Sequence, residues 1–139
     1  YRGWGHDITD QDTPLEAGLR FAVAFDKAFE FRGKMALQKQ LDQGIRKRLV
    51  VFTVDDPEPM LYGDEPIYRN GILVGNTTCG SYGHTIGRSV GMGYVNSDEI
   101  VNLEFILSGS YEIEIAGSRF SATASLRPVY DPKGKRVRA

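Results

Sequence analysis

Residues 66–78, Pro-Ile-Tyr-Arg-Asn-Gly-Ile-Leu-Val-Gly-Asn-Thr-Thr, carry the clearest fold signal in the chain. Two runs rich in β-branched and aromatic residues, 66–68 and 72–78, flank Asn70 and Gly71. Asn and Gly both tolerate the positive φ angles that tight hairpin turns require. The stretch therefore predicts a β-hairpin with its turn at Asn70 and Gly71.

Strand patterns continue on both sides of this hairpin. Residues 48–54 (Arg-Leu-Val-Val-Phe-Thr-Val) are strongly β-forming, and further strands are expected at residues 89–95, 101–107, 111–115 and 119–126. Gly117 marks a tight turn between the last two strands. Many short strands at regular spacing favour a sandwich or a small closed barrel. The positions expected to pack inside it, or against the residues before it, include Leu49, Val51, Ile72, Val74 and Tyr94.

The first 45 residues have a different pattern. Residues 10–14 (Asp-Gln-Asp-Thr-Pro) form a turn or cap cluster, and the alternation of apolar residues in 19–25 predicts a strand. Apolar residues at helical spacing predict a helix over about residues 33–43, ending at Gly44. The sequence thus predicts a mainly β protein, preceded by a short α/β segment with one helix.

Composition excludes several classes of function. The chain has 139 residues, with 17 Lys and Arg, 18 Asp and Glu, and a formal net charge of -1. This balance lacks the basic excess typical of proteins that bind nucleic acid or anionic membranes. No stretch approaches the roughly 18 consecutive apolar residues that span a membrane. The chain begins without Met or a signal-peptide pattern, so we expect it to be a fragment of a longer protein.

Residues able to carry chemistry are few. His6 and His84 lack carboxylates at metal-ligand spacing, so two ordinary polar histidines are favoured over a metal site or a His6-Asp7 acid/base pair. Cys79, the one cysteine, cannot form an internal disulfide and has no cationic neighbour in sequence, which favours a packed or loop thiol over a reactive one. Residues 80–83 (Gly-Ser-Tyr-Gly) lack the Gly-Lys-Ser/Thr ending of a phosphate loop and favour a glycine-rich barrel loop.

Two further groups leave alternatives open. Residues 46–48 (Arg-Lys-Arg) either bind an anion or belong to the barrel surface, and the surface interpretation is favoured. Tyr1 and Trp4 are aromatic residues in a glycine-rich stretch, and flat rings can stack on a heteroaromatic ligand. Taken alone, the two rings favour core packing over ligand binding.

The order of several motifs resembles the glycine-cleavage aminomethyltransferase (T-protein) family. The resemblance rests on Gly5-His6-Asp7, on residues 13–19 and 31–37, and on the barrel stretches 48–50, 70–75, 77–82 and 89–95, all in the same order. Further details resemble the sarcosine and dimethylglycine dehydrogenases within this family. They are Tyr1-Arg2 with Trp4, the expected strand at 101–107 and the ending 130–137.

The resemblance implies a specific fold and site. Residues 1–45 would be the tail of a folate-binding domain, and residues 46–139 would form a six-stranded Greek-key barrel. In the family, tetrahydrofolate occupies a central cavity and takes up a one-carbon unit. The family's catalytic Asp, pterin-binding Glu and folate-binding Arg precede the position of Tyr1, so no catalytic residue is expected here. Tyr1 maps onto a family folate contact, and Trp4 lies close to it; no metal ligands are implied.

The implied function is that of a C-terminal portion that helps to enclose a folate site. The parent protein would demethylate an N-methyl amino acid with FAD in an upstream flavin domain and pass the one-carbon unit to tetrahydrofolate. The chain alone would be inactive, and its partners would be the upstream folate-binding and flavin domains, with no nucleic acid and no membrane. The alternatives are a stand-alone aminomethyltransferase and a non-catalytic regulatory protein of the same fold. Bacterial cytoplasm and mitochondrial matrix both fit.

Overall fold

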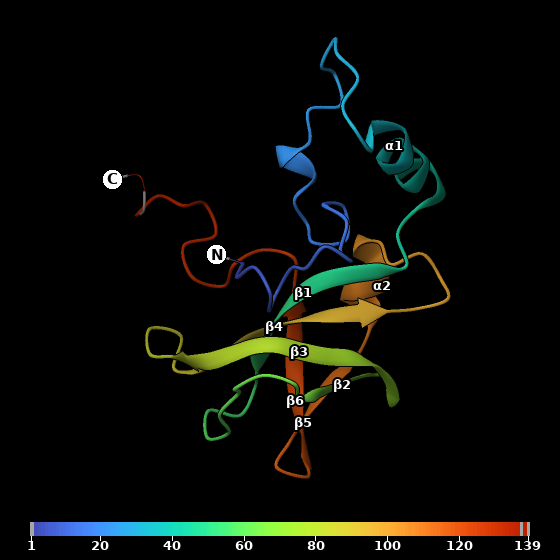
Figure 1. Cartoon of the computed structure of the whole chain (residues 1–139). Helices are drawn as coiled ribbons and strands as arrows, with labels where there is room; N and C mark the ends of the chain where they lie inside the picture. Colours follow the sequence, from blue (N-terminus) through green and yellow to red (C-terminus); the bar gives the residue numbers. More distant parts are fainter. Residues whose placement is uncertain (1, 137, 139) are drawn as a thin grey trace.

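A computed structural model of the chain describes residues 2–136 and residue 138. Within them, six strands pair antiparallel and close into a barrel with the spatial order β1-β4-β3-β2-β5-β6 (Figure 1). The strands are β1 (Lys47–Val54), β2 (Pro66–Arg69), β3 (Ile72–Gly83), β4 (Arg88–Asn96), β5 (Tyr111–Ile115) and β6 (Ser118–Ser125). The prediction of a mainly β protein with a six-stranded barrel is therefore confirmed.

Strand β1 shows how the barrel interior is built. Val50, Phe52 and Val54 alternate along it and are completely buried. The Phe52 ring meets the Tyr111 ring edge to face, with centroids 5.3 Å apart. The other buried members of the same core are Leu61, Ile67, Val95, Val101, Ile106, Ile113 and Ala122. The barrel thus closes around a single apolar cluster, which is what stabilises it.

Both predicted hairpin turns are present. Asn70 and Gly71 have φ angles of 51° and 80°, and Ala116 and Gly117 have nearly the same pair, 50° and 80°. Two consecutive positive φ angles give the turn whose twist matches the flanking strands. In the second turn, the position that Asn occupies in the first is filled by Ala, a residue that adopts this conformation less readily.

Glycines allow close approach between parts of the barrel. At Gly93 in β4, a Cβ atom would lie 2.5 Å from Ile67 Cδ1 and 2.6 Å from the Asn76 carbonyl oxygen. At Gly80, a Cβ atom would lie 2.4 Å from Leu61 Cβ. Residues 80–83 belong to strand β3 and pack closely there. The expected glycine-rich loop at this position was wrong.

Two predicted strands have other structures. Residues 101–107, expected as a strand, contain helix α2 (Leu103–Ser108), whose first turn is capped by the Asn102 side chain accepting from the Phe105 amide. Residues 19–25 contain only a short 3-10 helix, η1 (Arg20–Ala22). In both segments the alternating apolar residues resemble a strand. Neither segment supplies a strand to the closed barrel, because each of its six strands already pairs with a strand on both sides.

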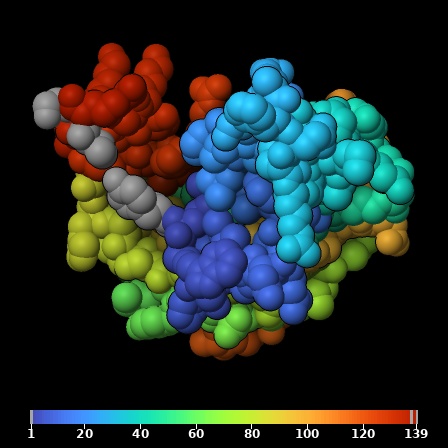
Figure 2. Space-filling view, turned by 45° about the horizontal axis from the view of Figure 1, so that its top comes forward, coloured from blue at the N-terminus to red at the C-terminus, as the bar shows by residue number. Residues whose placement is uncertain are grey.

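The residues before the barrel lie against its outside. Figure 2 shows the N-terminal part of the chain, in blue, spread over one face of the molecule. Helix α1 (Lys34–Gln43) ends at Gly44 as expected, and none of its ten residues is buried. Leu49 and Tyr94 are buried, and Val51 and Val74 are half-buried, as predicted. Ile72 is the exception, because it directly follows the turn and remains 69% exposed.

Candidate functional site

The buried carboxylate of Asp7 attaches the N-terminal residues to the barrel. Its Oδ2 atom accepts from the Gly3 amide at 2.7 Å, and its Oδ1 atom accepts from the Thr78 hydroxyl at 2.6 Å. The Tyr94 hydroxyl donates to the Asp7 carbonyl oxygen at 3.0 Å. Because β3 supplies Thr78 and β4 supplies Tyr94, residues 3–7 are fixed to two adjacent strands.

The protonation states of Asp7 and Cys79 suit them to hold the N-terminal residues in place rather than to react with a substrate. Burial raises the pKa of the Asp7 carboxyl, but hydrogen bonding with Cys79, Thr78 and the Gly3 amide outweighs it, so the pKa lies below its usual value. Burial and the neighbouring Asp7 carboxylate raise the pKa of the Cys79 thiol. The thiol therefore stays protonated near neutral pH and is a poor nucleophile, in agreement with the expected packed thiol.

A second attachment lies at the start of β1. The Lys47 ammonium forms an ion pair with Asp12, whose other carboxylate oxygen accepts from the Thr9 amide and hydroxyl. The same ammonium lies 4.3 Å from the centroid of the Tyr94 ring, and burial raises the pKa of the Tyr94 hydroxyl. Residues 9–12 are thus held to the barrel by the Lys47 ammonium, which is only partly exposed to solvent.

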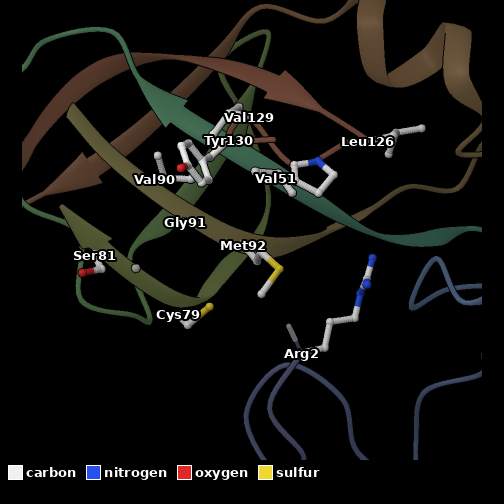
Figure 3. Close-up of a pocket in the computed structure, with 12 residues that line it drawn as sticks. Arg2, Val51, Cys79, Ser81, Val90, Gly91, Met92, Leu126, Val129 and Tyr130 are labelled. Carbon is white, nitrogen blue, oxygen red and sulfur yellow. The ribbon is translucent and has the colours of Figure 1, made fainter. Parts of the chain in front are cut away.

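An apolar groove of about 430 Å³ runs beside these attachments (Figure 3). One wall comes from β1, β3 and β4, with Val51, Cys79 and Met92, and the other from Leu126 and the residues that follow it, including Val129 and Tyr130. Figure 3 shows the Arg2 side chain extending toward the groove from the N-terminal residues. Arg2 is the one charged residue in the described lining. A groove of this kind suits an apolar acid, with Arg2 at the anionic end.

The two predicted folate contacts differ in what the structure says of them. Tyr1 lies outside the described residues. Trp4 is 75% exposed, and its backbone forms an isolated bridge with Ile8. The Trp4 indole is therefore not sealed in a core within this part of the chain.

Other residues singled out from the sequence take ordinary roles. His6 is exposed, and the His84 ring meets the Tyr82 ring edge to face. Among the described residues, no cluster of His, Cys, Asp and Glu could hold a metal ion. In the run 46–48, Arg46 donates to the Asp98 carbonyl oxygen, and Arg48 is half-buried. This basic run is thus only partly a surface feature.

Sequence reasoning missed the roles of Asp7 and Arg2. The partners of Asp7, Thr78 and Tyr94, are far away in sequence, so no local spacing links the three residues. The one signal available was Asp7 itself, a carboxylate between His6 and Ile8 that follows the two glycines Gly3 and Gly5. Arg2 carried no signal, because the opposite wall of its groove comes from residues 126–130.

No described helix is both long enough and apolar enough to cross a bilayer.

Comparison with known proteins gives a consistent result. The model of the glycine cleavage T-protein C-terminal barrel domain matches residues 47–131. The chain is 44% identical over 138 residues to 4-methylaminobutanoate oxidase (formaldehyde-forming) of Paenarthrobacter nicotinovorans, covering 99% of this chain and 16% of that protein. It is 40% identical over 140 residues to the mitochondrial sarcosine dehydrogenase of Homo sapiens, covering 99% and 15% respectively.

A solved structure agrees with these sequence matches. The glycine cleavage system aminomethyltransferase T of Bartonella henselae superposes with a TM-score of 0.73 at 25% identity, over 88% of this chain and 33% of that one. The chain therefore spans about one sixth of the length of the two curated relatives and a third of the solved structure. Residues 47–131 include the whole closed barrel, and the chain belongs to the glycine cleavage T-protein C-terminal barrel domain family.

Proposed function

We propose that the chain is the C-terminal portion of a sarcosine or dimethylglycine dehydrogenase-like protein and that it encloses one side of a tetrahydrofolate site. The observation that carries the proposal is the match over 99% of the chain, at 44% and 40% identity, to an oxidase of methylaminobutanoate and to a sarcosine dehydrogenase. Identity to an aminomethyltransferase of Rubrobacter xylanophilus is lower, at 33% over 136 residues. This gradient favours the dehydrogenase branch over a stand-alone aminomethyltransferase. It does not separate the regulatory alternative, because the mitochondrial pyruvate dehydrogenase phosphatase regulatory subunit of Mus musculus is 42% identical over 137 residues.

The proposed division of the chain places residues 1–45 in a folate-binding domain and residues 46–139 in the barrel domain. Its support is the exposure of large apolar side chains before the barrel. Phe21, Phe29 and Met35 are 85%, 74% and 80% exposed. Monomeric proteins rarely leave a segment of this kind uncovered. Such exposure is expected where the rest of a larger domain packs.

The residues present fit one side of a folate site. Tetrahydrofolate, when bound, supplies the amine nitrogens that take up a one-carbon unit. Trp4 offers an exposed indole for stacking, and the Arg2 guanidinium at the apolar groove offers a donor for a carboxylate. Tyr1 would add a second aromatic surface. In this proposal, the three side chains bind and orient the ligand and exclude water from one side of it.

FAD does not fit the described residues. The one glycine-rich run that resembles a phosphate loop, residues 80–83, is part of strand β3, and the residues after it form a turn rather than a helix. It therefore lacks the helix N-terminus that stabilises a dinucleotide phosphate. The proposal places FAD in an upstream flavin domain of the same protein, and no step involves FAD here.

The proposal also assigns no catalytic residue to this chain. Asp7 uses both carboxylate oxygens to hold the N-terminal residues, and the Cys79 thiol is kept neutral by burial. Neither group is available to move a proton or attack a substrate. We therefore expect the 139-residue chain alone to be inactive.

Two assays test the proposal. The purified chain should neither demethylate sarcosine or dimethylglycine nor form methylenetetrahydrofolate, whereas the full gene product should do both. Turnover by the chain alone would contradict the assignment of catalysis to upstream residues. A full gene product that acts only on a lipoyl-bound aminomethyl group would establish the aminomethyltransferase alternative. One with no activity on any of these donors would establish the regulatory alternative.

Substitution of the aromatic residues tests the folate contact in the full gene product. Tyr1→Ala and Trp4→Ala should each weaken tetrahydrofolate binding by about 1–3 kcal/mol, as for other stacked aromatic residues, with little loss of thermal stability. Tyr62→Ala is the matched control, since Tyr62 is equally exposed at 75% and lies in the barrel part of the chain, outside residues 1–45. Unchanged folate affinity together with a large loss of stability would identify both rings as packing residues.

A further inference from the structure

A second cavity, of about 290 Å³, lies between helix α1, the start of β1 and the residues that precede α2. It shares only Leu126 with the groove of Figure 3, so it is a separate space. Most of its wall is aliphatic, built from Leu15, Leu41, Ile45, Ile100, Val101, Leu103 and Leu126. A few polar groups in an apolar cavity fix the orientation of a ligand, so the polar groups here decide what the cavity binds.

Arg48 provides the main polar group. It shares the alternation of Val50 and Phe52 along β1, so it occupies the end of the barrel interior. Its Nε atom is buried and has no hydrogen-bond partner among the described residues. A buried donor without a partner is unfavourable by about 1–3 kcal/mol, and native proteins rarely leave one. Arg48 therefore points to a missing acceptor.

Gln40 provides a complementary acceptor in the same cavity. Its Nε2 atom donates to Glu16 Oε1 at 3.0 Å, which fixes the orientation of the amide. Its Oε1 atom is buried and also lacks a partner within the described part of the chain. The cavity thus offers one unpaired donor and one unpaired acceptor.

The charges around the cavity favour an anion near Arg48. Arg20 also lines the cavity, and Arg2 is close enough to Arg48 to lower its pKa, although burial lowers it more. The Glu16 carboxylate, which accepts from Gln40 beside the cavity, also accepts from the Thr13 amide at 2.9 Å. A carboxylate bound between Arg48 and Arg20 would pair a charge that the protein leaves unpaired.

We propose that this cavity binds a small organic acid that carries an N–H or O–H group next to its carboxylate, such as an α-amino or α-hydroxy acid with an aliphatic side chain. Arg48 and Arg20 hold the carboxylate, Gln40 Oε1 accepts from the neighbouring N–H or O–H, and the aliphatic wall holds the side chain. Inorganic phosphate fits less well, because the apolar wall leaves most of its oxygens without donors. The lining of this cavity shares only Leu126 with the groove of Figure 3, and Arg2 of the groove is close enough to influence the pKa of Arg48.

Titration with matched acids tests the proposal. The probes are leucine, 2-hydroxy-4-methylpentanoate, 4-methylpentanoate, 4-methylpentanol and inorganic phosphate, followed by calorimetry and by the NMR signal of Arg48 Nε. Leucine, the hydroxy acid or both should bind at least about tenfold more tightly than the other three probes, and should shift the Arg48 Nε signal. Tighter binding of leucine alone would identify an amino acid, and of the hydroxy acid alone a hydroxy acid. No shift with any probe would mean that water alone fills the cavity and would overturn the proposal.

Variants separate a built site from general ionic attraction. Arg48→Met should lower affinity at least about tenfold, and Gln40→Leu should remove the preference for a donor next to the carboxylate. Arg32→Met is the matched control, because Arg32 is exposed and lies outside the cavity lining. If Arg48→Met does not fold, Arg20→Met gives the same test from the rim. Equal losses in Arg20→Met and Arg32→Met would also overturn the proposal.

Discussion

The barrel encloses a buried apolar core, whereas the described residues before it bury only Leu15 and Ala17 among their apolar side chains. Phe52 and Ile113 are completely buried in the barrel, while Phe21 and Met35 before it are 85% and 80% exposed. The N-terminal part therefore gains little of its stability from apolar burial.

Polar contacts hold the N-terminal residues instead. Asp7 hydrogen-bonds to Thr78 of β3 and Asp12 pairs with Lys47 of β1, so each attachment ends on a barrel strand. The comparison teaches that the barrel can hold its own shape, while residues 2–45 take their position from the barrel. The following predictions test this difference.

The largest effect should come from the barrel core. Phe52→Ala removes a completely buried ring that meets Tyr111, and should lower the free energy of unfolding by about 3–5 kcal/mol. Phe21→Ala, at 85% exposure, should change it by less than about 0.5 kcal/mol. Urea denaturation followed by circular dichroism measures both values. Similar losses in the two variants would mean that the N-terminal residues share one cooperative core with the barrel.

Next in size is a steric change within the barrel wall. Gly93→Ala would place a Cβ atom 2.5 Å from Ile67 Cδ1 and 2.6 Å from the Asn76 carbonyl oxygen, and should destabilise the protein by about 3 kcal/mol. Gly117→Ala is the control, because its Cβ meets nothing within 4 Å and only its φ of 80° is unfavourable. That control should lose about 1 kcal/mol in the same denaturation experiment. A tolerated Gly93→Ala would show that β3 and β4 can separate without loss of closure.

A smaller and more local effect should come from Asp7. Asp7→Asn replaces one of the two acceptor oxygens with an NH2 group, which faces either the Gly3 amide or the Thr78 hydroxyl, and should destabilise residues 3–8 by about 1–3 kcal/mol. Amide hydrogen exchange should rise at Gly3 and Ile8 while the amides of β1 and β4 stay protected. Uniform loss of protection throughout the barrel would contradict a local attachment.

The same variant has a pH signature. The folded pKa of Asp7 lies below its usual value, so its carboxylate stabilises the N-terminal attachment above about pH 4, and this stabilisation is lost as the pH falls through the folded pKa. Asp7→Asn should lack this acid transition. Asp10→Asn, at an exposed position three residues away, should keep it. Asp7→Asn should also lower the pKa of the Cys79 thiol, because the Asp7 carboxylate is one of the causes that raise this pKa. The pH dependence of Cys79 alkylation measures the change.

The smallest expected effect is stabilising. Ala116 has a φ of 50° at the first position of its turn, where Asn70 stands in the other hairpin. Ala116→Asn should therefore raise the free energy of unfolding by about 0.5 kcal/mol. Asn70→Ala should lower it by more than this amount, because Asn70 Oδ1 also accepts from the Ser110 amide at 2.9 Å. A thermal melt of the two variants gives both signs.

Sequence patterns predicted the barrel better than the residues around it. The two hairpin turns were predictable because Asn-Gly and Ala-Gly-Ser act through local backbone angles. The alternation Val101, Leu103, Phe105 suggested a strand, but a strand needs a partner, and the closed barrel has no free edge. The Asn102 cap then favours a helix there. Local periodicity cannot report whether a partner strand is available.

The candidate site was predictable only in part. Residue type and the family resemblance point to Trp4, whose indole is exposed and whose role as a folate contact stays a prediction. The groove could not be identified from the sequence, because Arg2, Met92 and Tyr130 meet only after the barrel has closed. The cavity at Arg48 was hidden for a related reason. The three basic residues 46–48 are consecutive in sequence and suggest a single basic patch. Side chains alternate along β1, so Lys47 pairs with Asp12 whereas Arg48 lines the second cavity.

The pairing of β1 with both β4 and β6 has a consequence for the order of folding. Strand β1 begins at Lys47, yet its neighbours end at Asn96 and Ser125. During synthesis on a ribosome, the apolar run of β1 emerges first and waits until nearly the whole barrel sequence has been made. Such distant pairings fold slowly compared with the local hairpins β2–β3 and β5–β6. Closure of the barrel by β6 is therefore expected to be a late step in folding, and chains interrupted before Ser125 would keep one side of β1 unpaired.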